Sequence, residues 1–275
     1  MKSDRSRATA RLLRRTLVVA LLIRAAGGAA GATEITGDHR LIRSFIEDGA
    51  IVQIGWLELA GTYTRQDEGR DLVAETLASF RIGEEFEAGF TLGFLDRQRQ
   101  AGDTLFGAPI PSDIDGAGFA DPRVFGKYRL LRSPVEMSVG ASATLPLGDE
   151  DNGRGAGSLR YEVFLGLRKR FTRVTWIGSA AVLKHEDSEA PGAAEGNTTA
   201  RVGVGAIVPF SRIWALIAQA TYEGAPYGNG DDPADVLLGL DWRPTENTAI
   251  RGAVDAGLTD AAPDLQAILT AAFNF

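Results

Sequence analysis

The chain has 275 residues, a formal net charge of −7 and no cysteine. Without cysteine, a disulfide framework and a thiolate metal site are excluded. The sequence has no run of about 18 consecutive apolar residues, which excludes a membrane-spanning helix. Two classes remain: a soluble protein, and a membrane β-barrel, whose strands are apolar on one face only.

The first 32 residues have the layout of a secretory signal peptide. Six basic residues lie within residues 1–15, an apolar run follows from Thr16 to Ile23, and small residues continue to Ala32. We therefore predict export and cleavage near Ala32. The remaining chain would carry 22 basic and 35 acidic residues, a net charge of −13. That charge argues against nucleic acid as a partner.

Residues 33–55 precede the first predicted strand and admit two interpretations. Leu41, Ile42, Phe45 and Ile46 are apolar residues at helical spacing among charged neighbours. They suit a short plug inserted into a barrel. They also suit a periplasmic leader, and the sequence favours the leader because chain termini are usually loose.

From Trp56 to the C-terminus, apolar and polar residues alternate in segments of about ten to thirteen residues separated by breaks. This alternation predicts β-strands with one apolar face. Twelve segments follow the pattern: 56–64, 72–81, 85–95, 121–131, 135–145, 158–168, 173–183, 199–208, 212–223, 235–243, 247–258 and 264–275.

The breaks between these segments alternate in length. Breaks such as 81–85 and 130–135 are short, whereas 96–120 and 146–157 are long and rich in Gly or acidic residues. Short turns on one side and long loops on the other are typical of outer-membrane barrels, whose short turns face the periplasm. We predict an all-β fold, a twelve-stranded antiparallel transmembrane up-and-down β-barrel over residues 56–275.

The apolar faces of these strands carry aromatic residues near the strand ends, among them Trp176, Trp214, Tyr222 and Trp242. Aromatic girdles at the two membrane interfaces are typical of such barrels. The opposite faces are rich in Gly and Ser and carry charges of both signs, as a crowded lumen would. We predict that the apolar face contacts lipid. The alternative is a soluble, secreted all-β protein with that face inside.

The final segment, LQAILTAAFNF, is apolar at every second position from Leu265 and ends on Phe275. A terminal Phe is typical of the closing strand of a bacterial outer-membrane barrel. We predict that this strand pairs with the first strand near Trp56 to Thr64, so that no sheet edge remains. Phe273 and Phe275 then form an assembly signal for the barrel-assembly machinery.

Residues 119–171 carry a recognisable pattern. It consists of Gly118 and Asp121, then Lys127, Tyr128, Arg129, Leu130 and Leu131, then Leu145-Pro146-x-Gly148 after a strand, while GTYTR (61–65) closes the first strand. The pattern resembles a family of outer-membrane barrel transporters that includes the "MetA-pathway of phenol degradation" proteins. Residues 35–53 are only loosely similar to that family. The resemblance implies a channel or uptake barrel for small, hydrophobic or aromatic molecules.

Charged residues on the polar faces are the candidate functional residues. The basic ones are Arg123, Lys127, Arg129, Arg160, Arg168, Arg173, Arg201 and Arg251, and the acidic ones are Glu75, Glu85, Glu87, Glu136, Glu162, Glu223, Asp241 and Asp255. Opposed walls of opposite sign create a transverse field that orients polar solutes. One interpretation is a selectivity constriction. The other is a set of interior salt-bridge ladders that fill a narrow barrel.

Two loop features and the absence of binding motifs also bear on function. Loop 96–120 is the longest break, and its apolar residues Leu105, Phe106 and Ile110 suggest a gate that folds inward. The acidic runs 148–153 and 229–233 lack EF-hand spacing, so a solvated surface is favoured over a Ca²⁺ site or divalent bridges to lipopolysaccharide. The motifs of nucleotide, metal or cofactor binding do not occur in the sequence.

The sequence predicts a non-enzymatic outer-membrane channel for passive uptake of small molecules, in contact with outer-membrane lipid and lipopolysaccharide. A structural or adhesive barrel that acts through its loops is one alternative. A hydrolase at the rim is a weaker one, based on His185 beside Glu186, Asp187 and Ser188.

Overall fold

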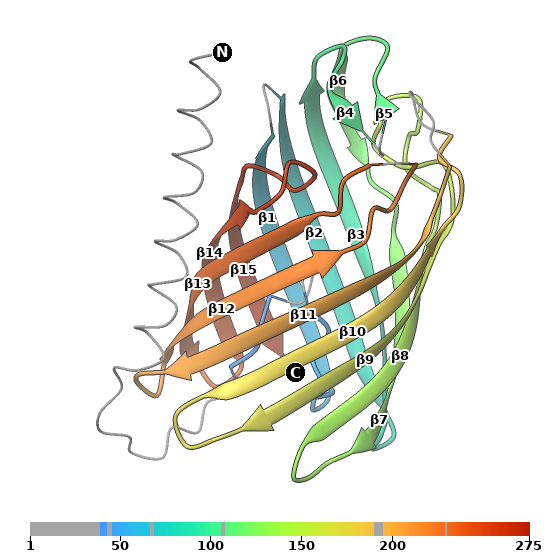
Figure 1. The fold of residues 1–275 in the computed structure, drawn as a ribbon. Coiled ribbons are helices and arrows are strands. Elements are labelled where there is room, and N and C mark those ends of the chain that lie inside the picture. Colours follow the sequence, from blue (N-terminus) through green and yellow to red (C-terminus); the bar gives the residue numbers. More distant parts are fainter. Residues whose placement is uncertain (1–38, 43–45, 67–68, 106–107, 190–194, 229) are drawn as a thin grey trace.

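The computed structural model describes residues 39–42, 46–66, 69–105, 108–189, 195–228 and 230–275. The predicted signal peptide lies outside the described residues. The strands form a closed antiparallel barrel (Figure 1), which confirms the predicted fold class. In the described part of the chain, no helix is long and apolar enough to cross a membrane.

The strands of the wall follow one another around the barrel in chain order, whereas β4 and β5 form a separate two-stranded sheet. Their bounds are β1 (Gly55–Gln66), β2 (Gly69–Ile82), β3 (Phe86–Arg99), β4 (Thr104–Leu105), β5 (Ala108–Pro109), β6 (Ile114–Phe119), β7 (Arg123–Leu131), β8 (Glu136–Thr144), β9 (Arg160–Arg170), β10 (Thr175–His185), β11 (Thr198–Pro209), β12 (Trp214–Glu223), β13 (Ala234–Thr245), β14 (Thr248–Gly257) and β15 (Leu265–Asn274).

The two ends of the barrel differ in their connections. One end, here called the turn end, carries the connections 83–85, 132–135, 171–174, 210–213 and 246–247. The opposite end, called the loop end, carries the long loops between β8 and β9, β10 and β11, and β12 and β13. The alternation predicted from the sequence is therefore present.

The first and last strands close the barrel. β1 pairs with β15 in antiparallel register from Trp56 opposite Asn274 to Arg65 opposite Leu265, as predicted. Beyond this ladder, the amide of Gly55 donates to the carbonyl of Phe275 at 2.8 Å. Pairing the two edges satisfies backbone groups that lipid cannot hydrogen-bond.

The fourth wall strand is longer than predicted and is broken in the middle. β6 and β7 both pair with β3, with residues 120–122 between them. The Asp121 carboxylate accepts hydrogen bonds from the amides of Gly148 and Ala156 at 2.8 and 2.9 Å, which ties the break to the next loop. Much of the predicted loop 96–120 is thus strand, because β3 continues to Arg99 and β6 returns along it.

The outer surface of the barrel is apolar, as the sequence analysis predicts. Leu59, Leu92, Val163 and Leu269 are among its exposed side chains. Exposed aromatic residues lie toward both ends: Tyr63, Tyr161 and Tyr222 toward the loop end, and Tyr128, Trp176, Phe210 and Phe273 toward the turn end. Such a surface suits lipid, with the aromatic rings at the two interfaces.

Glycines on the inner face let two aromatic rings lie against the wall. Phe125 is paired with Gly89 across β7 and β3, and Phe164 is paired with Gly140 across β9 and β8. A Cβ added at Gly140 would lie 2.2 Å from the Phe164 ring and 2.6 Å from the carbonyl oxygen of Gly126. This wall therefore has no room for a side chain at Gly140.

We expect Gly140→Val to destabilise the barrel by about 1–3 kcal/mol, because the added methyl groups overpack the inner wall. The measurement is urea unfolding in lipid vesicles, followed by heat-modifiable migration on gels. Gly178→Val on β10 is the matched control, since a Cβ there meets nothing within 4 Å. Equal stability of the two variants would contradict the packing argument.

Candidate functional site

An N-terminal segment, defined here as the described residues 39–42 and 46–52, lies inside the barrel. All of these residues are buried, and they have no regular secondary structure. The sequence favours a periplasmic leader, whereas the structure places the segment in the lumen. The reason is that the wall offers partners for its charges and an apolar surface for its aliphatic side chains.

The apolar contacts involve the side of the wall formed by β10 to β15. Leu41, Ile42 and Ile46 form one buried cluster with inward-facing aliphatic residues, namely Ile177, Ile207, Ala215, Ile217, Leu237, Ala253 and Ile268. A Cβ added at Gly203 would lie 2.8 Å from Ile46, and one at Gly205 would lie 2.5 Å from Leu41. The predicted polar lumen is therefore apolar over this part of the wall.

Asp48 anchors the segment to the opposite side. Arg168 of β9 donates to the Asp48 carboxylate at 2.5 Å and to the carbonyl oxygen of His39 at 2.6 Å. The next residue, Gly49, lies against the strands themselves, since an added Cβ would be 2.5 Å from the carbonyl oxygen of Glu136. The segment is held both by charge and by close backbone contact.

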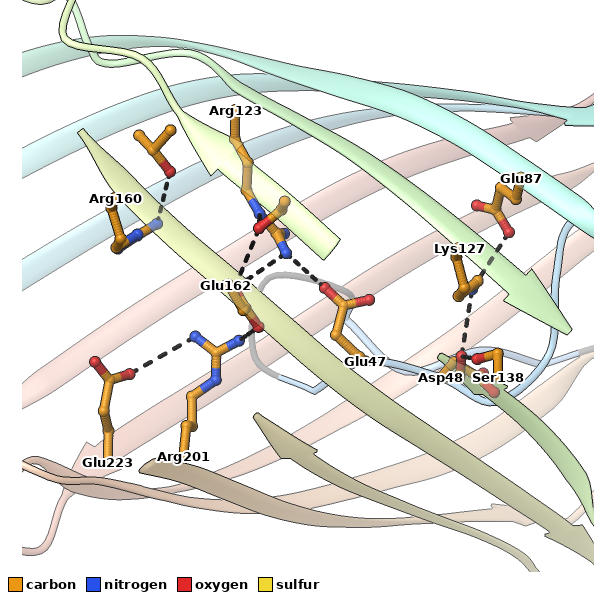
Figure 2. A network of polar contacts seen from close by, with 12 residues as sticks. Glu47, Asp48, Glu87, Arg123, Lys127, Ser138, Arg160, Glu162, Arg201 and Glu223 are labelled. Carbon is orange, nitrogen blue, oxygen red and sulfur yellow. Dashed lines mark hydrogen bonds and ion pairs between the residues drawn. The ribbon is translucent and has the colours of Figure 1, made fainter. Parts of the chain in front are cut away.

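Lys127 of β7 forms a second anchor. Its ammonium group donates to the carbonyl oxygens of Asp48 and Ala50 at 3.2 and 2.7 Å, and it lies 3.3 Å from the Glu87 carboxylate (Figure 2). Glu87 also accepts a hydrogen bond from the amide of Val52 at 2.9 Å. Lys127 and Glu87 are both fully buried.

A third anchor comes from β14 and β1. Arg251 donates to the carbonyl oxygen of Leu41 at 2.8 Å and to the Glu58 carboxylate at 2.9 Å. The Trp56 indole also donates to Glu58, at 3.0 Å. The guanidinium carbons of Arg40 and Arg251 lie 5.3 and 5.2 Å from the centre of the Trp56 ring, within the range of cation–π attraction.

Nearer the loop end, arginines and carboxylates from β7, β9, β11 and β12 form a continuous network (Figure 2). Arg123 lies 2.8 Å from Glu47 of the segment and 3.3 Å from Glu162. Arg201 contacts Glu162 as well, and its other nitrogen lies 3.6 Å from Glu223. Arg160 donates to the Thr144 hydroxyl at 3.2 Å.

Three further carboxylates lie on strands around the β1–β15 seam: Glu75 of β2, Asp255 of β14, and Asp235 of β13, which is paired with Thr221 of β12. Within the part of the chain that the structure describes, they form no ion pair. Asp235 accepts a hydrogen bond from the Thr221 hydroxyl, whereas the Oδ1 atom of buried Asp255 has no hydrogen-bond partner. A small cavity of about 30 Å³ borders Glu75 and Glu58 beside Ile42 of the segment.

Several predicted lumen residues lie at the turn-end rim instead of in the interior. Arg173 lies exposed in the turn 171–174, because β9 ends at Arg170 and β10 begins at Thr175. Arg129 contacts Glu85 at 2.7 Å, and Glu136 contacts the exposed Arg170 at 3.2 Å. Hydrogen bonds from Arg132 and Arg129 hold the pKa of Glu85 below its ordinary value.

The predicted gate loop packs on another loop. Leu105 and Ile110 form a buried cluster with Ile114, and a Cβ added at Gly153 would lie 2.6 Å from Leu105. Phe106 lies outside the described residues. The apolar character of this stretch is thus explained by contact with the loop that follows β8.

His185 is packed at the loop end beneath the loop that follows β12. Its ring lies 5.2 Å from the Tyr227 ring, and its Nε2 lies 3.5 Å from Glu223. Ser188, the nucleophile that the hydrolase alternative requires, instead donates to the carbonyl oxygen of Ala156 at 3.1 Å. The hydrolase alternative therefore gains no support from the contacts of His185.

The sequence alone did not identify all of the interior. The inward aliphatic residues of β10 to β13 were missed because their strands carry apolar residues on both faces. Asp235 was missed as well, although the alternation places it on the same face as Asp241. No sequence signal pairs Asp48 with Arg168, since 120 residues separate them.

Neither a protein-family model nor a curated protein matches this chain. Solved structures do. The COG4313 outer membrane channel from Pseudomonas putida F1 is similar with a TM-score of 0.64 at 9% identity, over 86% of this chain and 100% of that one. The KdgM porin has a TM-score of 0.54 at 9% identity, over 80% and 99% of the two chains. The NanC porin has a TM-score of 0.54 at 10% identity, over 80% and 100%. These similarities show a shared fold.

We expect Arg168→Met to loosen the N-terminal segment, because it leaves the buried Asp48 carboxylate without its ion-pair partner. Breaking a buried pair from one side costs about 3–5 kcal/mol. The measurement is deuterium uptake by amides 46–52, which should become faster. Arg170→Met is the control: this residue lies on the same strand and is 54% exposed in its contact with Glu136, so uptake should change little. Equal uptake in the two variants would contradict the anchoring role of Arg168.

Proposed function

We propose that this chain is an outer-membrane channel for passive passage of small solutes, and that its N-terminal segment is the plug that closes the lumen. The turn end then faces the periplasm, in accord with the layout of such barrels. The predicted signal peptide and the terminal Phe275 support export and insertion through the barrel-assembly machinery. Contact with lipopolysaccharide at the loop end belongs to the same proposal.

The observation that carries the proposal is how the lumen is filled. The N-terminal segment (described residues 39–42 and 46–52) is buried in the lumen and contacts the wall on opposite sides. The wall strands pair with one another around the closed barrel, and the described residues of the segment add no strand to that ladder. Release of the segment would therefore leave the barrel wall intact.

The fold similarity gives independent support. The similar structures are named as an outer membrane channel and as porins. Their names do not identify a solute for this chain. The charged network near the loop end favours polar solutes, whereas the sequence resemblance favours hydrophobic or aromatic ones.

A disulfide offers a direct test, because the chain has no cysteine of its own. A Cβ at Gly203 would lie 2.8 Å from Cγ1 of Ile46. A disulfide places the Cβ of one cysteine about 3 Å from the sulfur of the other, as its S–S length requires. We expect oxidised Ile46→Cys/Gly203→Cys to conduct little in planar bilayers, and dithiothreitol to restore the wild-type conductance.

Deletion of residues 39–52 tests the same proposal from the other side. We expect a several-fold rise in single-channel conductance, because the wall charges then face water.

The wild-type protein with dithiothreitol is the control for the disulfide experiment, and Gly61→Cys, which faces open space, controls for the effect of a cysteine alone. A deletion variant that folds and leaves the bilayer sealed would overturn the channel proposal.

A further inference from the structure

We infer that the channel prefers cationic solutes, such as small amines, although arginines dominate its visible network. This inference rests on the proposed channel function and names its substrate class. It follows from which lumen charges are compensated inside the protein and which are not.

The arginine network has no surplus positive charge. Arg123, Arg160 and Arg201 are matched by three carboxylates, Glu47, Glu162 and Glu223. Arg160 forms no direct ion pair with a described residue; Glu223 and Glu162 attract it, whereas Arg123 and Arg201 repel it. An anion that approached these guanidinium groups would have to displace carboxylates that are already in place.

The contacts of the N-terminal segment are balanced in the same way. Lys127 and Glu87, Arg168 and Asp48, and Arg251 and Glu58 form three buried pairs of opposite charge. The Asp241 carboxylate lies 2.7 Å from His39, and Arg40 lies near Asp48. Neither the ion pairs around the N-terminal segment nor the arginine network therefore supplies a strong attraction for anions.

The wall around the β1–β15 seam is different. Glu75, Asp235 and Asp255 come from β2, β13 and β14, which lie on one side of the barrel close to the β1–β15 seam. Glu58 lies near Glu75, and Asp235 near Asp255, so each pair brings two like charges together, and a cation close to them would offset their repulsion. The cation that acts on Glu75 is Arg123, which already pairs with Glu47 and Glu162. At the loop-end rim, Arg97 and Arg99 share Asp71, which leaves one positive charge. The three carboxylates exceed it.

Two observations show that this wall lacks a partner. The Oδ1 atom of Asp255 has no hydrogen-bond partner although the residue is only 2% exposed. A buried polar atom left unpaired is costly, so a donor from the lumen would stabilise it. The cavity beside Glu75 and Glu58 is also lined by Thr62, whose hydroxyl is a further oxygen for a cation or its water. An ammonium or alkali cation supplies what these oxygens lack.

Reversal potentials in a KCl gradient across planar bilayers test the inference. We expect the full-length chain to pass K⁺ in preference to Cl⁻ at about 0.1 M salt, and the preference to shrink at about 1 M, where the Debye length falls to about 3 Å. Glu75→Gln/Asp235→Asn/Asp255→Asn should lower the K⁺/Cl⁻ permeability ratio at least about twofold.

Two further variants provide a change in the other direction and a control. Arg123→Gln leaves Glu47 and Glu162 less compensated, so the ratio should rise. Glu84→Gln, in the exposed turn 83–85, should leave it unchanged. Because the triple variant removes buried groups, Glu75→Gln alone serves if the triple variant does not fold, since Glu75 is only partly buried.

The outcomes separate this inference from the channel proposal. A conducting wild type with a K⁺/Cl⁻ ratio at or below one, or a ratio that the carboxylate variants do not lower, overturns the cation preference and leaves the channel standing. A sealed bilayer for the wild type and for the deletion of residues 39–52 overturns both.

Discussion

A chain segment that runs through the inside of a closed barrel must find a partner for each of its charged and backbone groups. The wall here provides them from several strands at once. Arg168, Lys127 and Arg251 each contact a backbone carbonyl oxygen of the N-terminal segment and a carboxylate. Because each cation serves both groups, the path of the segment and the charge balance of the lumen depend on the same three side chains.

The wall holds the N-terminal segment by two kinds of contact, apolar packing and ion pairing. The side formed by β10 to β15 packs aliphatic side chains against Leu41, Ile42 and Ile46. The side formed by β3, β7 and β9 holds Asp48 and its neighbours by charge. Apolar packing alone would let the segment shift along the wall, whereas directional hydrogen bonds define its position. The combination explains how an irregular stretch without helix or strand is buried in one arrangement.

The sequence predicts the strands of the wall better than it predicts the contacts inside the lumen. Period-two alternation and the placement of aromatic residues were enough to derive the strands, the closing pair and the lipid face, because these depend on local pattern. The inward side chains of Lys127, Arg251 and Asp255 also follow from that alternation. The alternation does not show which charged residues form ion pairs, because the contact between Arg168 and Asp48 joins residues 120 positions apart. The alternation also does not fix where each strand ends. Arg173 was predicted to face the lumen, but it lies in a turn because β9 ends and β10 begins on either side of it.

The N-terminal segment is continuous with β1, and that connection leaves the barrel beside the closing pair, where Gly55 and Phe275 exchange hydrogen bonds. A displaced segment therefore stays attached within a few residues of its own binding surface. Its return is an intramolecular event, with an effective concentration in the millimolar range for a short flexible tether. In the proposed channel, the fraction of open barrels is then a property of each molecule, independent of the number of copies in the membrane, and a free peptide of the same sequence would compete only at comparably high concentration.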